Sequence, residues 1–202
     1  FPVEPDGIRF GLVAIKNIGR GFIQSVVRER EQGGSFTSLQ DFCDRMYDCG
    51  DMNKRAVENL IRSGAFDSMG ARRSQLLAVY EKVLDGIGNV RRRNVEGQID
   101  FFGMSAANST VETVVMPDIP EFTATERMHM EKETTGLYLS GHPMVGYRAA
   151  ARSSGAVTLN EILEDVSSEE GPTRFADGMP VTVAGIVASS KTRPTKKGTL
   201  MA

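Results

Sequence analysis

Apolar residues recur at helical spacing through the first 90 residues, which predicts three short amphipathic helices separated by glycine-bearing turns. The first helix should open on a capping box, with Thr37 as the N-cap and Gln40 three residues further on. The second should start near Asn53, and the third should start after Gly70. The expected ends of the second and third helices are glycines, namely Gly64 and either Gly86 or Gly88.

Residues 86–122 interrupt this pattern. Asn, Ser, Thr, Gly and Pro dominate there, which is typical of a linker or a long exposed loop. Two later capping boxes, Thr123-x-x-Glu126 and Thr158-x-x-Glu161, each predict a further helix. The first of these helices should run to about Ser140, because Gly141-His142-Pro143 then ends it.

The last segment changes to the alternating period of a β-strand. Val181, Val183 and Val187 alternate with other side chains in a β-rich run. A basic turn over residues 191–198 and a short run over residues 199–202 then predict the return strand of a hairpin. Because a lone hairpin is marginally stable in water, we expect the start of a sheet domain that is cut short.

The composition narrows the class of protein. The chain has 202 residues, of which 40% are hydrophobic and 25% charged, so it can bury a core. It has no apolar run that spans a membrane and no signal peptide, so a cytoplasmic protein is expected. Two cysteines and two distant histidines disfavour a disulfide framework and a zinc site. The net charge of −2 combines +2 over residues 1–97 with −4 over residues 98–202, so a local basic face is compatible with nucleic acid.

The stretch Ala14–Ile23 has the pattern of a helix-hairpin-helix. Residues with helical spacing, Ile8, Leu12 and Ile15, precede a glycine-bearing turn, and a second amphipathic helix follows it. Glycines let the backbone approach a phosphate, and the free amides of the second helix then point at the anion. The residues expected to contact DNA are Lys16, Asn17, Gly19, Arg20 and Gly21. The alternative is an ordinary helical hairpin closed by glycine.

A second, more degenerate hairpin is expected over Arg62–Arg73. Arg72 and Arg73 would lie in the first turn of a helix, where the dipole disfavours cations, so a phosphate nearby would explain them. Both are therefore candidate DNA contacts. The alternative is a solvated basic patch, and the same two interpretations apply to Arg91-Arg92-Arg93.

An aromatic pair lies inside the polar loop, in the stretch Gly97–Gly103. A loop has no core of its own, so Phe101 and Phe102 preceded by Gln98 form a candidate docking motif. The alternative is that the apolar side chains fold back onto the helices of the chain. No catalytic constellation stands out: the sequence contains no Walker loop, no G-x-S-x-G and no carboxylates at metal-ligand spacing.

An ordered set of motifs resembles the C-terminal part of the alpha subunit of bacterial DNA polymerase III, the replicative C-family polymerase. The motifs, in chain order, are Ile8-Arg9-Phe10-Gly11-Leu12, Ala14-Ile15-Lys16, Ile18-Gly19, Phe36-x-Ser38-Leu39-x-Asp41-Phe42, Asn53-Lys54-Arg55, Leu60-Ile61, Gly64-Ala65-Phe66-Asp67, Glu131-Lys132-Glu133, Gly136, Tyr138-Leu139-Ser140-Gly141-His142-Pro143, Val183-x-Gly185-x-Val187, Lys191-Thr192, Lys196-Lys197-Gly198 and Met201-Ala202. They cover nearly the whole chain.

The resemblance implies roles for these segments. The internal sliding-clamp motif of the family falls on Gln98, Ile99, Asp100, Phe101 and Phe102. The hairpin around Gly19 and Gly21 matches the element that holds duplex DNA. Asn17 stands where glycine is frequent, and Asn tolerates the left-handed conformation better than most residues. Partners implied by the family are duplex DNA, the sliding clamp (beta subunit), single-stranded DNA through a complete OB-fold, and other replisome subunits.

The same resemblance predicts a mainly α architecture. It comprises a tandem helix-hairpin-helix domain at 1–90 at the end of the fingers, a loop with the clamp motif at 91–122, a helical connector at 123–178 and a truncated OB-fold at 179–202. The parent is expected to be a DNA-directed DNA polymerase whose catalytic aspartates and Mg²⁺ lie in a palm upstream, outside this fragment. Two other classes stay open, namely a stand-alone helix-hairpin-helix repair nuclease or adaptor, and a helical scaffold without a nucleic-acid role.

Overall fold

The computed structural model describes residues 10–50, 52–95, 114–168, 171–187 and 190–194, and the backbone of short strands at 3–4, 7–8 and 200–201. The chain divides into two compact units, Phe1–Ser140 and Gly141–Ala202. The predicted boundary at residue 122 differs from this division because the next helix packs onto the first unit. The clamp motif predicted at Gln98–Phe102 lies outside the described residues.

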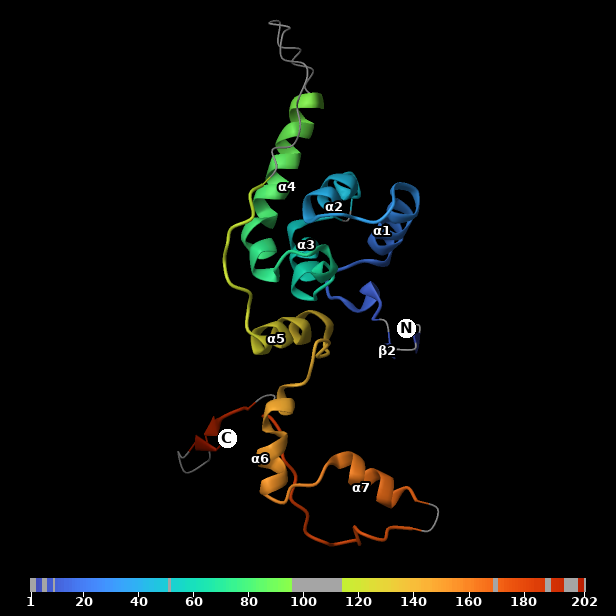
Figure 1. Cartoon of the computed structure of the whole chain (residues 1–202), viewed down its shortest axis with the longest axis vertical. Helices are drawn as coiled ribbons and strands as arrows, with labels where there is room; N and C mark the ends of the chain where they lie inside the picture. Colours follow the sequence, from blue (N-terminus) through green and yellow to red (C-terminus); the bar gives the residue numbers. More distant parts are fainter. Residues whose placement is uncertain are drawn as a thin grey trace, which may run out of the picture. The chain divides into compact units, whose positions relative to one another are not determined.

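The first unit is helical (Figure 1). Its helices are α1 (Arg20–Gly33), α2 (Leu39–Met46), α3 (Lys54–Arg62), α4 (Arg73–Val95) and α5 (Ala124–Thr135), with single 3-10 turns η1 (Leu12–Ala14) and η2 (Asp67–Met69). The two-residue strands β1 (Val3–Glu4) and β2 (Gly7–Ile8) pair antiparallel before η1. The mainly helical class predicted from the sequence is thus confirmed.

One hydrophobic core joins α1, α2, α3 and α4. Phe42 lies at its centre, and its ring meets those of Phe36 and Phe66 edge-on, with 5.0 Å between centroids in both pairs. Phe22 of α1 joins the same cluster at 6.4 Å from Phe42. Such T-shaped pairs contribute about 0.5–1.5 kcal/mol beyond their buried area. The aromatic cluster therefore fixes α1, which carries the candidate DNA site, against α2.

The observed helix starts correct one predicted cap and confirm another. The N-cap of α2 is Ser38, whose hydroxyl accepts from the Asp41 N–H at 3.1 Å. Thr37, the predicted N-cap, lies one residue earlier and donates its N–H to the Asp41 carboxylate at 2.8 Å. The box is shifted by one residue because Asp41, not Gln40, supplies the reciprocal acceptor. Asn53 is the N-cap of α3, as predicted.

Helix α4 continues through both predicted stop glycines. It runs 23 residues to Val95, whereas Gly86 or Gly88 was expected to end it. A Cβ on Gly88 would lie 2.6 Å from the Tyr47 hydroxyl, so this glycine lets α2 approach α4 closely. Its role is packing and not termination. The loop predicted to begin at residue 86 therefore starts later than expected.

The structure also corrects the first helix of the predicted hairpin. Ile8, Leu12 and Ile15 were expected to share a helix, but the chain forms the short strand β2 and then the single turn η1. Only three residues are helical there, which is too short for the spacing to mark an α-helix. The hairpin is thus a 3-10 turn, a tight reversal and α1.

Two predicted capping boxes are present, at α5 and at α7. Thr123 and Glu126 exchange bonds at the start of α5, and Thr158 and Glu161 do the same at the start of α7. Helix α5 ends at Thr135 and not near Ser140, because Gly136 takes the left-handed conformation at φ 82°. Figure 1 shows α5 lying crosswise to α4.

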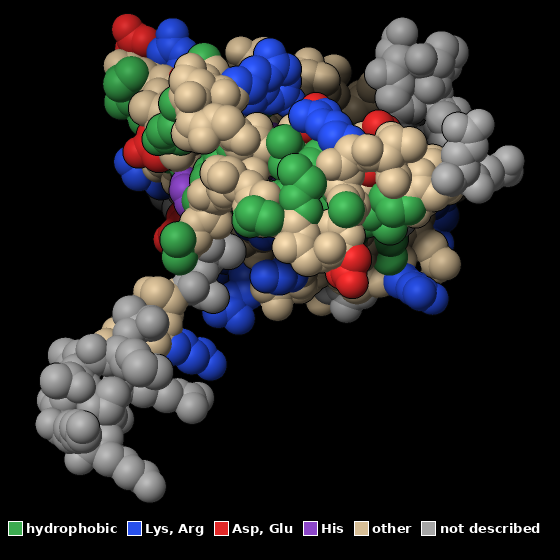
Figure 2. All heavy atoms as spheres, turned by 90° about the horizontal axis from the view of Figure 1, so that it is seen from below, with side chains coloured by type: hydrophobic (Ala, Val, Ile, Leu, Met, Phe, Trp, Pro, Cys, Tyr) green, Lys and Arg blue, Asp and Glu red, His purple; other side chains and the backbone are tan. Residues whose placement is uncertain are grey.

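The second unit contains η3 (Pro143–Tyr147), α6 (Arg148–Ser153), α7 (Leu159–Val166), β3 (Arg193–Pro194) and β4 (Leu200–Met201). Phe175 is its buried aromatic residue, at 8% exposure. Its large exposed apolar side chains are Val145, Tyr147, Leu159, Leu163, Val166, Met179, Val181, Val183, Ile186 and Val187. Figure 2 shows apolar side chains interspersed with polar ones over the face of the molecule that it presents.

The predicted hairpin between residues 181–187 and 199–202 is not formed. The strand that pairs with Leu200–Met201 is Arg193–Pro194, antiparallel. The valine run is extended without a strand ladder, and one of its backbone bonds joins the Val157 N–H to the Thr182 carbonyl at 2.9 Å. Alternation predicts a face but not a partner, so this part of the OB-fold prediction is not confirmed.

Candidate nucleic-acid interface

The candidate site is the reversal between η1 and α1, which includes all five residues predicted at the first hairpin. Asn17 has φ 63°, the left-handed conformation that Asn accepts better than most residues. Gly19 is the N-cap of α1 in an extended conformation, and a Cβ placed on it would meet no atom within 4 Å. Lys16, Asn17, Gly19, Arg20 and Gly21 are all exposed. The backbone of this reversal is therefore open to a large partner.

Two neighbouring helices hold the reversal from behind. The Lys16 N–H donates to the Thr134 carbonyl of α5 at 2.8 Å. The Asn59 amide of α3 donates to the Lys16 carbonyl at 2.7 Å. Both Asn59 and Thr134 are buried, at 9% and 4% exposure. Because both backbone groups of Lys16 are engaged inside the protein, the exposed edge of the turn keeps one conformation before any ligand arrives.

The N-terminus of α1 has the features of an anion site. No side chain of the described residues caps it, and its first turn carries no acidic residue. The first amides of a helix lack partners within the helix, and the helix dipole adds positive potential at this end. Lys16 and Arg20 flank these amides, and neither side chain pairs with a carboxylate in the described part of the chain. The arrangement suits a phosphate group.

The N-terminus of α4, in the second predicted hairpin, is already occupied by a carboxylate. Glu121 accepts from the N–H groups of Arg73 at 2.8 Å and Ser74 at 3.1 Å. It also accepts from the Phe122 N–H at 2.8 Å. Burial acts to raise the pKa of Glu121, but these N–H donors outweigh it and lower the pKa overall. An internal anion thus fills the place proposed for a phosphate.

The two arginines predicted to contact DNA at this second hairpin are also engaged internally. Arg72 donates to the Asp118 carboxylate at 3.1 Å and to the Ile119 carbonyl at 2.8 Å. Arg73 is 3% exposed, and its guanidinium contacts both Asp67 and Glu131. Arg73 therefore leaves the set of candidate DNA contacts, because its cation lies inside the domain. A phosphate is not needed to explain either arginine.

Glu131 connects three segments of the first unit. Its carboxylate accepts from Arg73 Nη2 at 3.0 Å, from the N–H groups of Leu139 and Ser140, both at 2.8 Å, and from the Ser140 hydroxyl at 3.0 Å. The side chain is fully buried. Burial alone would raise the pKa of Glu131, but hydrogen bonds from Ser140, Leu139 and Arg73 hold the pKa below its usual value. Glu131 thereby positions α5, whose Thr134 supports the reversal.

Sequence reasoning did not single out Asn59, Glu131 or Thr134 as supports of the site. A signal was available for Asn59, because it is a polar residue among the apolar positions Ala56, Leu60 and Ile61. Glu131 instead lay in a charged run, which is usually a solvated helix face. Glu131 is fully buried in the folded domain, whereas the side chain of Glu133 in the same run is 65% exposed.

The third basic cluster is also used within the first unit. Arg91 contacts Asp48, donates to the Asp44 carbonyl at 2.9 Å and lies over the ring of Tyr47 at 5.4 Å from its centroid. Arg92 donates to the Asn89 side chain at 2.7 Å. The contacts of Arg91 join α4 to the C-terminal end of α2, whereas the bond of Arg92 lies within α4.

Neither metal-ligating clusters nor membrane spans occur in the described part of the chain. Within those residues, no group of three or more His, Cys, Asp or Glu side chains could hold a metal ion. No helix among them is both long and apolar enough to cross a bilayer.

Comparison with known proteins agrees with the geometry of this site. The family model described as helix-hairpin-helix motif matches residues 1–76, the part that contains the reversal and α1 to α3. The chain is 35% identical over 201 residues to the DNA polymerase III subunit alpha of Vibrio cholerae, covering 98% of the chain and 16% of that protein. It is 34% identical over 202 residues to the Thermus aquaticus subunit, covering 100% of the chain and 15% of the relative.

The matched model assigns the first part of the chain to the helix-hairpin-helix class. Across nearly its full length, the chain is homologous to a segment of the DNA polymerase III alpha subunit, which confirms the resemblance found in its sequence. It spans less than a fifth of each of these relatives, up to 18% of the Pseudomonas aeruginosa subunit.

Proposed function

We propose that this chain is the part of a replicative DNA-directed DNA polymerase that holds the duplex by its phosphates. One observation carries the proposal: the N-terminus of α1 has no side-chain cap among the described residues and is flanked by Lys16 and Arg20. The reversal that leads into it is held by α3 and α5 through the backbone of Lys16. Binding through backbone amides reads no base sequence, so the site serves any duplex that passes. This property suits a polymerase, which must hold every sequence it copies.

The clamp contact belongs to the same proposal. Residues Gln98–Phe102 match the glutamine-led motif of the family, with Phe101 where Leu or Met is common. A peptide contact of modest affinity suffices for a tether, because tethering raises the effective concentration of polymerase at the primer end. Substitution of Gln98, Phe101 and Phe102 by Ala should abolish retention on immobilised sliding clamp. Unchanged retention would contradict this part of the proposal.

The parent protein would carry the chemistry. Nucleotidyl transfer would use Mg²⁺ held by palm carboxylates elsewhere in the polymerase, and the chain would act within a cytoplasmic replisome. This segment would then contribute no chemistry of its own. It would bind both the duplex and the sliding clamp. A completed OB-fold would add a contact to single-stranded DNA.

A salt titration tests the duplex site. We expect the affinity of the chain for a short duplex to fall with salt, and the double variant Lys16→Gln with Arg20→Gln to reduce the log–log slope by about 2. A matched control is Arg72→Gln with Lys82→Gln, which removes the same charge elsewhere. The control should leave the slope unchanged, because Arg72 is engaged by Asp118 and Ile119. Equal effects of the two double variants would contradict the assignment.

A further inference from the structure

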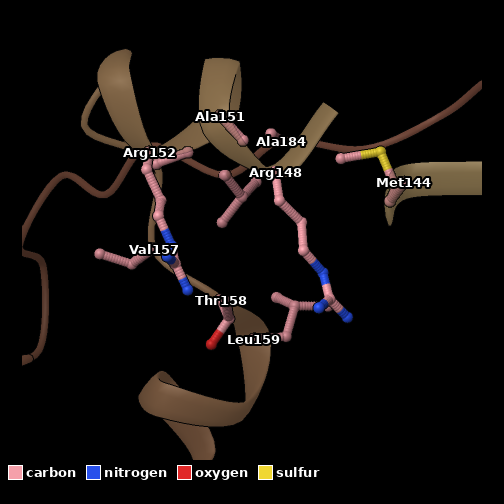
Figure 3. A pocket seen from close by; sticks show the side chains of 10 residues that line it. Met144, Arg148, Ala151, Arg152, Val157, Thr158, Leu159 and Ala184 are labelled. Carbon is pink, nitrogen blue, oxygen red and sulfur yellow. The ribbon is translucent and has the colours of Figure 1, made fainter. Parts of the chain in front are cut away.

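A cavity of about 390 Å³ opens within the second unit between α6 and the start of α7 (Figure 3). Two arginines one helical turn apart, Arg148 and Arg152, line it. Figure 3 shows both side chains leaving α6 on the same side and reaching toward Thr158 and Leu159. The cavity volume is in the range of small-ligand pockets, about 300–1,000 Å³.

Local backbone bonds build the walls of this cavity. Helix α6 is followed by a reversal at Gly155, where the Ala156 N–H donates to the Ala151 carbonyl at 3.0 Å. The Val157 N–H then donates to the Thr182 carbonyl at 2.9 Å, which holds the extended valine run beside the reversal. Apolar side chains, including those of Val157 and Ala184, complete the lining. The pocket thus belongs to one folded unit.

Among the described residues, the two arginines make no direct contact with a carboxylate, although Arg152 is near enough to Glu161 to help the hydrogen bonds from Thr158 lower the pKa of that carboxyl. Neither Arg148 nor Arg152 forms an ion pair within the described part of the chain. The neighbouring carboxylate of Glu161 accepts from the Thr158 N–H at 2.8 Å and faces Arg174 at 3.8 Å. Arg148 and Arg152 thus differ from Arg72, Arg73 and Arg91 of the first unit, which pair with carboxylates.

We propose that this cavity binds a nucleotide, with its phosphate held by Arg148 and Arg152 and its base in the apolar part. Guanidinium forks match phosphate oxygens in a bidentate geometry, and a planar base fits an apolar slot beside them. The guanidinium pair suits a phosphate better than a carboxylate because phosphate offers more acceptor oxygens to the two forks. The nucleotide is either free or part of a single strand, and this site is separate from the duplex site at α1.

Fluorescence anisotropy on the full 202-residue chain tests the proposal. The probe is a labelled single strand of about 15 nucleotides, with dAMP and inorganic phosphate as competitors. We expect Arg148→Gln with Arg152→Gln to weaken nucleotide binding about tenfold or more, because both charge-assisted phosphate contacts are lost. The control Arg174→Gln with Lys191→Gln removes equal charge from the same unit and should change affinity less than about twofold.

Further measurements distinguish binding of the base from binding of the phosphate. Ala184→Leu fills the apolar part and should weaken dAMP but not inorganic phosphate. Competition by dAMP identifies a free nucleotide as sufficient, whereas binding by the strand alone identifies a nucleotide within a strand. Three results would overturn the proposal. The first is an equal loss of affinity in the two double variants, and the second is stronger competition by an oligo-glutamate peptide than by dAMP. The third is that neither the strand nor dAMP binds. Duplex affinity of Arg148→Gln with Arg152→Gln should remain normal, which keeps this test distinct from that of the α1 site.

Discussion

Arg73 Nη2 and Glu131 Oε1 lie 3.0 Å apart, and both side chains are almost completely buried, at 4% and 0% exposure. The pair joins the start of α4 to the middle of α5. Asp67 is a second carboxylate partner of the same guanidinium and accepts from Arg73 Nη2 at 2.7 Å. Gly64 lies so close that a Cβ there would be 2.3 Å from Arg73 Nη2, and its φ of 83° also favours glycine. The ion pair thus fixes α5, which in turn supports the reversal that carries the proposed DNA site.

Glu131→Gln should destabilise the chain by about 3 kcal/mol, because it removes one partner of a buried ion pair. Glu133→Gln on the same helix is the matched control: Glu133 is 65% exposed in its contact with Arg62, so the expected cost is below about 0.5 kcal/mol. Urea denaturation monitored by circular dichroism measures both variants. Equal stability of the two variants would contradict the role given to Glu131.

The two glycines inside α4 should respond unequally to alanine. Gly86→Ala should raise the free energy of unfolding by about 0.5–1 kcal/mol, because its Cβ meets nothing within 4 Å and alanine favours the helix. Gly88→Ala should gain less, because its Cβ would lie 2.6 Å from the Tyr47 hydroxyl, which must move away. Thermal unfolding of both variants measures the difference. Equal gains from the two substitutions would show that the Tyr47 hydroxyl does not lie against Gly88.

Asp165 should make the second unit sensitive to acid. N–H groups of Phe175, Arg174 and Thr173 lower the pKa of Asp165 from 3.8 to about 2. A depressed folded-state pKa contributes stability that is present above about pH 3.8 and is lost as the pH falls through about 2. NMR titration of the Asp165 carboxyl carbon should give that low midpoint.

The loop at residues 173–175 provides a second readout of the same bonds. Asp165→Asn should lose protection of these amides from hydrogen exchange already at neutral pH. The control Asp177→Asn, an exposed aspartate of the same unit, should leave them unchanged. A normal Asp165 midpoint with unchanged protection would rule out the carboxylate as the anchor of this loop.

Local signals in the sequence identified α1 to α5 and α7 and several of their starts, but not the short helix α6. The apolar stripes of α2 and α3 and the boxes at Thr123 and Thr158 depend on neighbours within one or two turns, so the sequence alone reveals them. The contact of Gly88 with the Tyr47 hydroxyl involves a residue 41 positions earlier in the chain, so no local pattern contains it. Strand pairing at the end of the chain is equally nonlocal.

The candidate DNA site was also predictable only where it depends on residues close together in the sequence. The reversal at Lys16–Gly21 follows from local glycines and an Asn that accepts positive φ. The second hairpin has a similar local pattern, yet Glu121 reaches its amides from 48 residues beyond Arg73. The difference between an open and an occupied helix N-terminus therefore appears only in the folded chain.

Placing a carboxylate at the N-cap of α1 tests the central claim most directly. Gly19→Asp should fold without strain, since Gly19 has φ −75° and open space at its Cβ. The aspartate should cap α1 and raise stability by a few tenths of a kcal/mol over glycine, and by about 0.5–2 kcal/mol over alanine at the same position. It would also occupy the amides proposed for a phosphate, as Glu121 does at α4. Gly19→Ala is the uncharged control.

The decisive measurement is duplex affinity at low salt for wild type, Gly19→Ala and Gly19→Asp, alongside their unfolding free energies. We expect Gly19→Asp to be at least as stable as Gly19→Ala but to bind duplex about tenfold or more weakly, because an anion then faces the phosphate. Gly19→Ala should bind close to wild type. Equal duplex affinity of the aspartate and alanine variants would contradict phosphate binding at the N-terminus of α1.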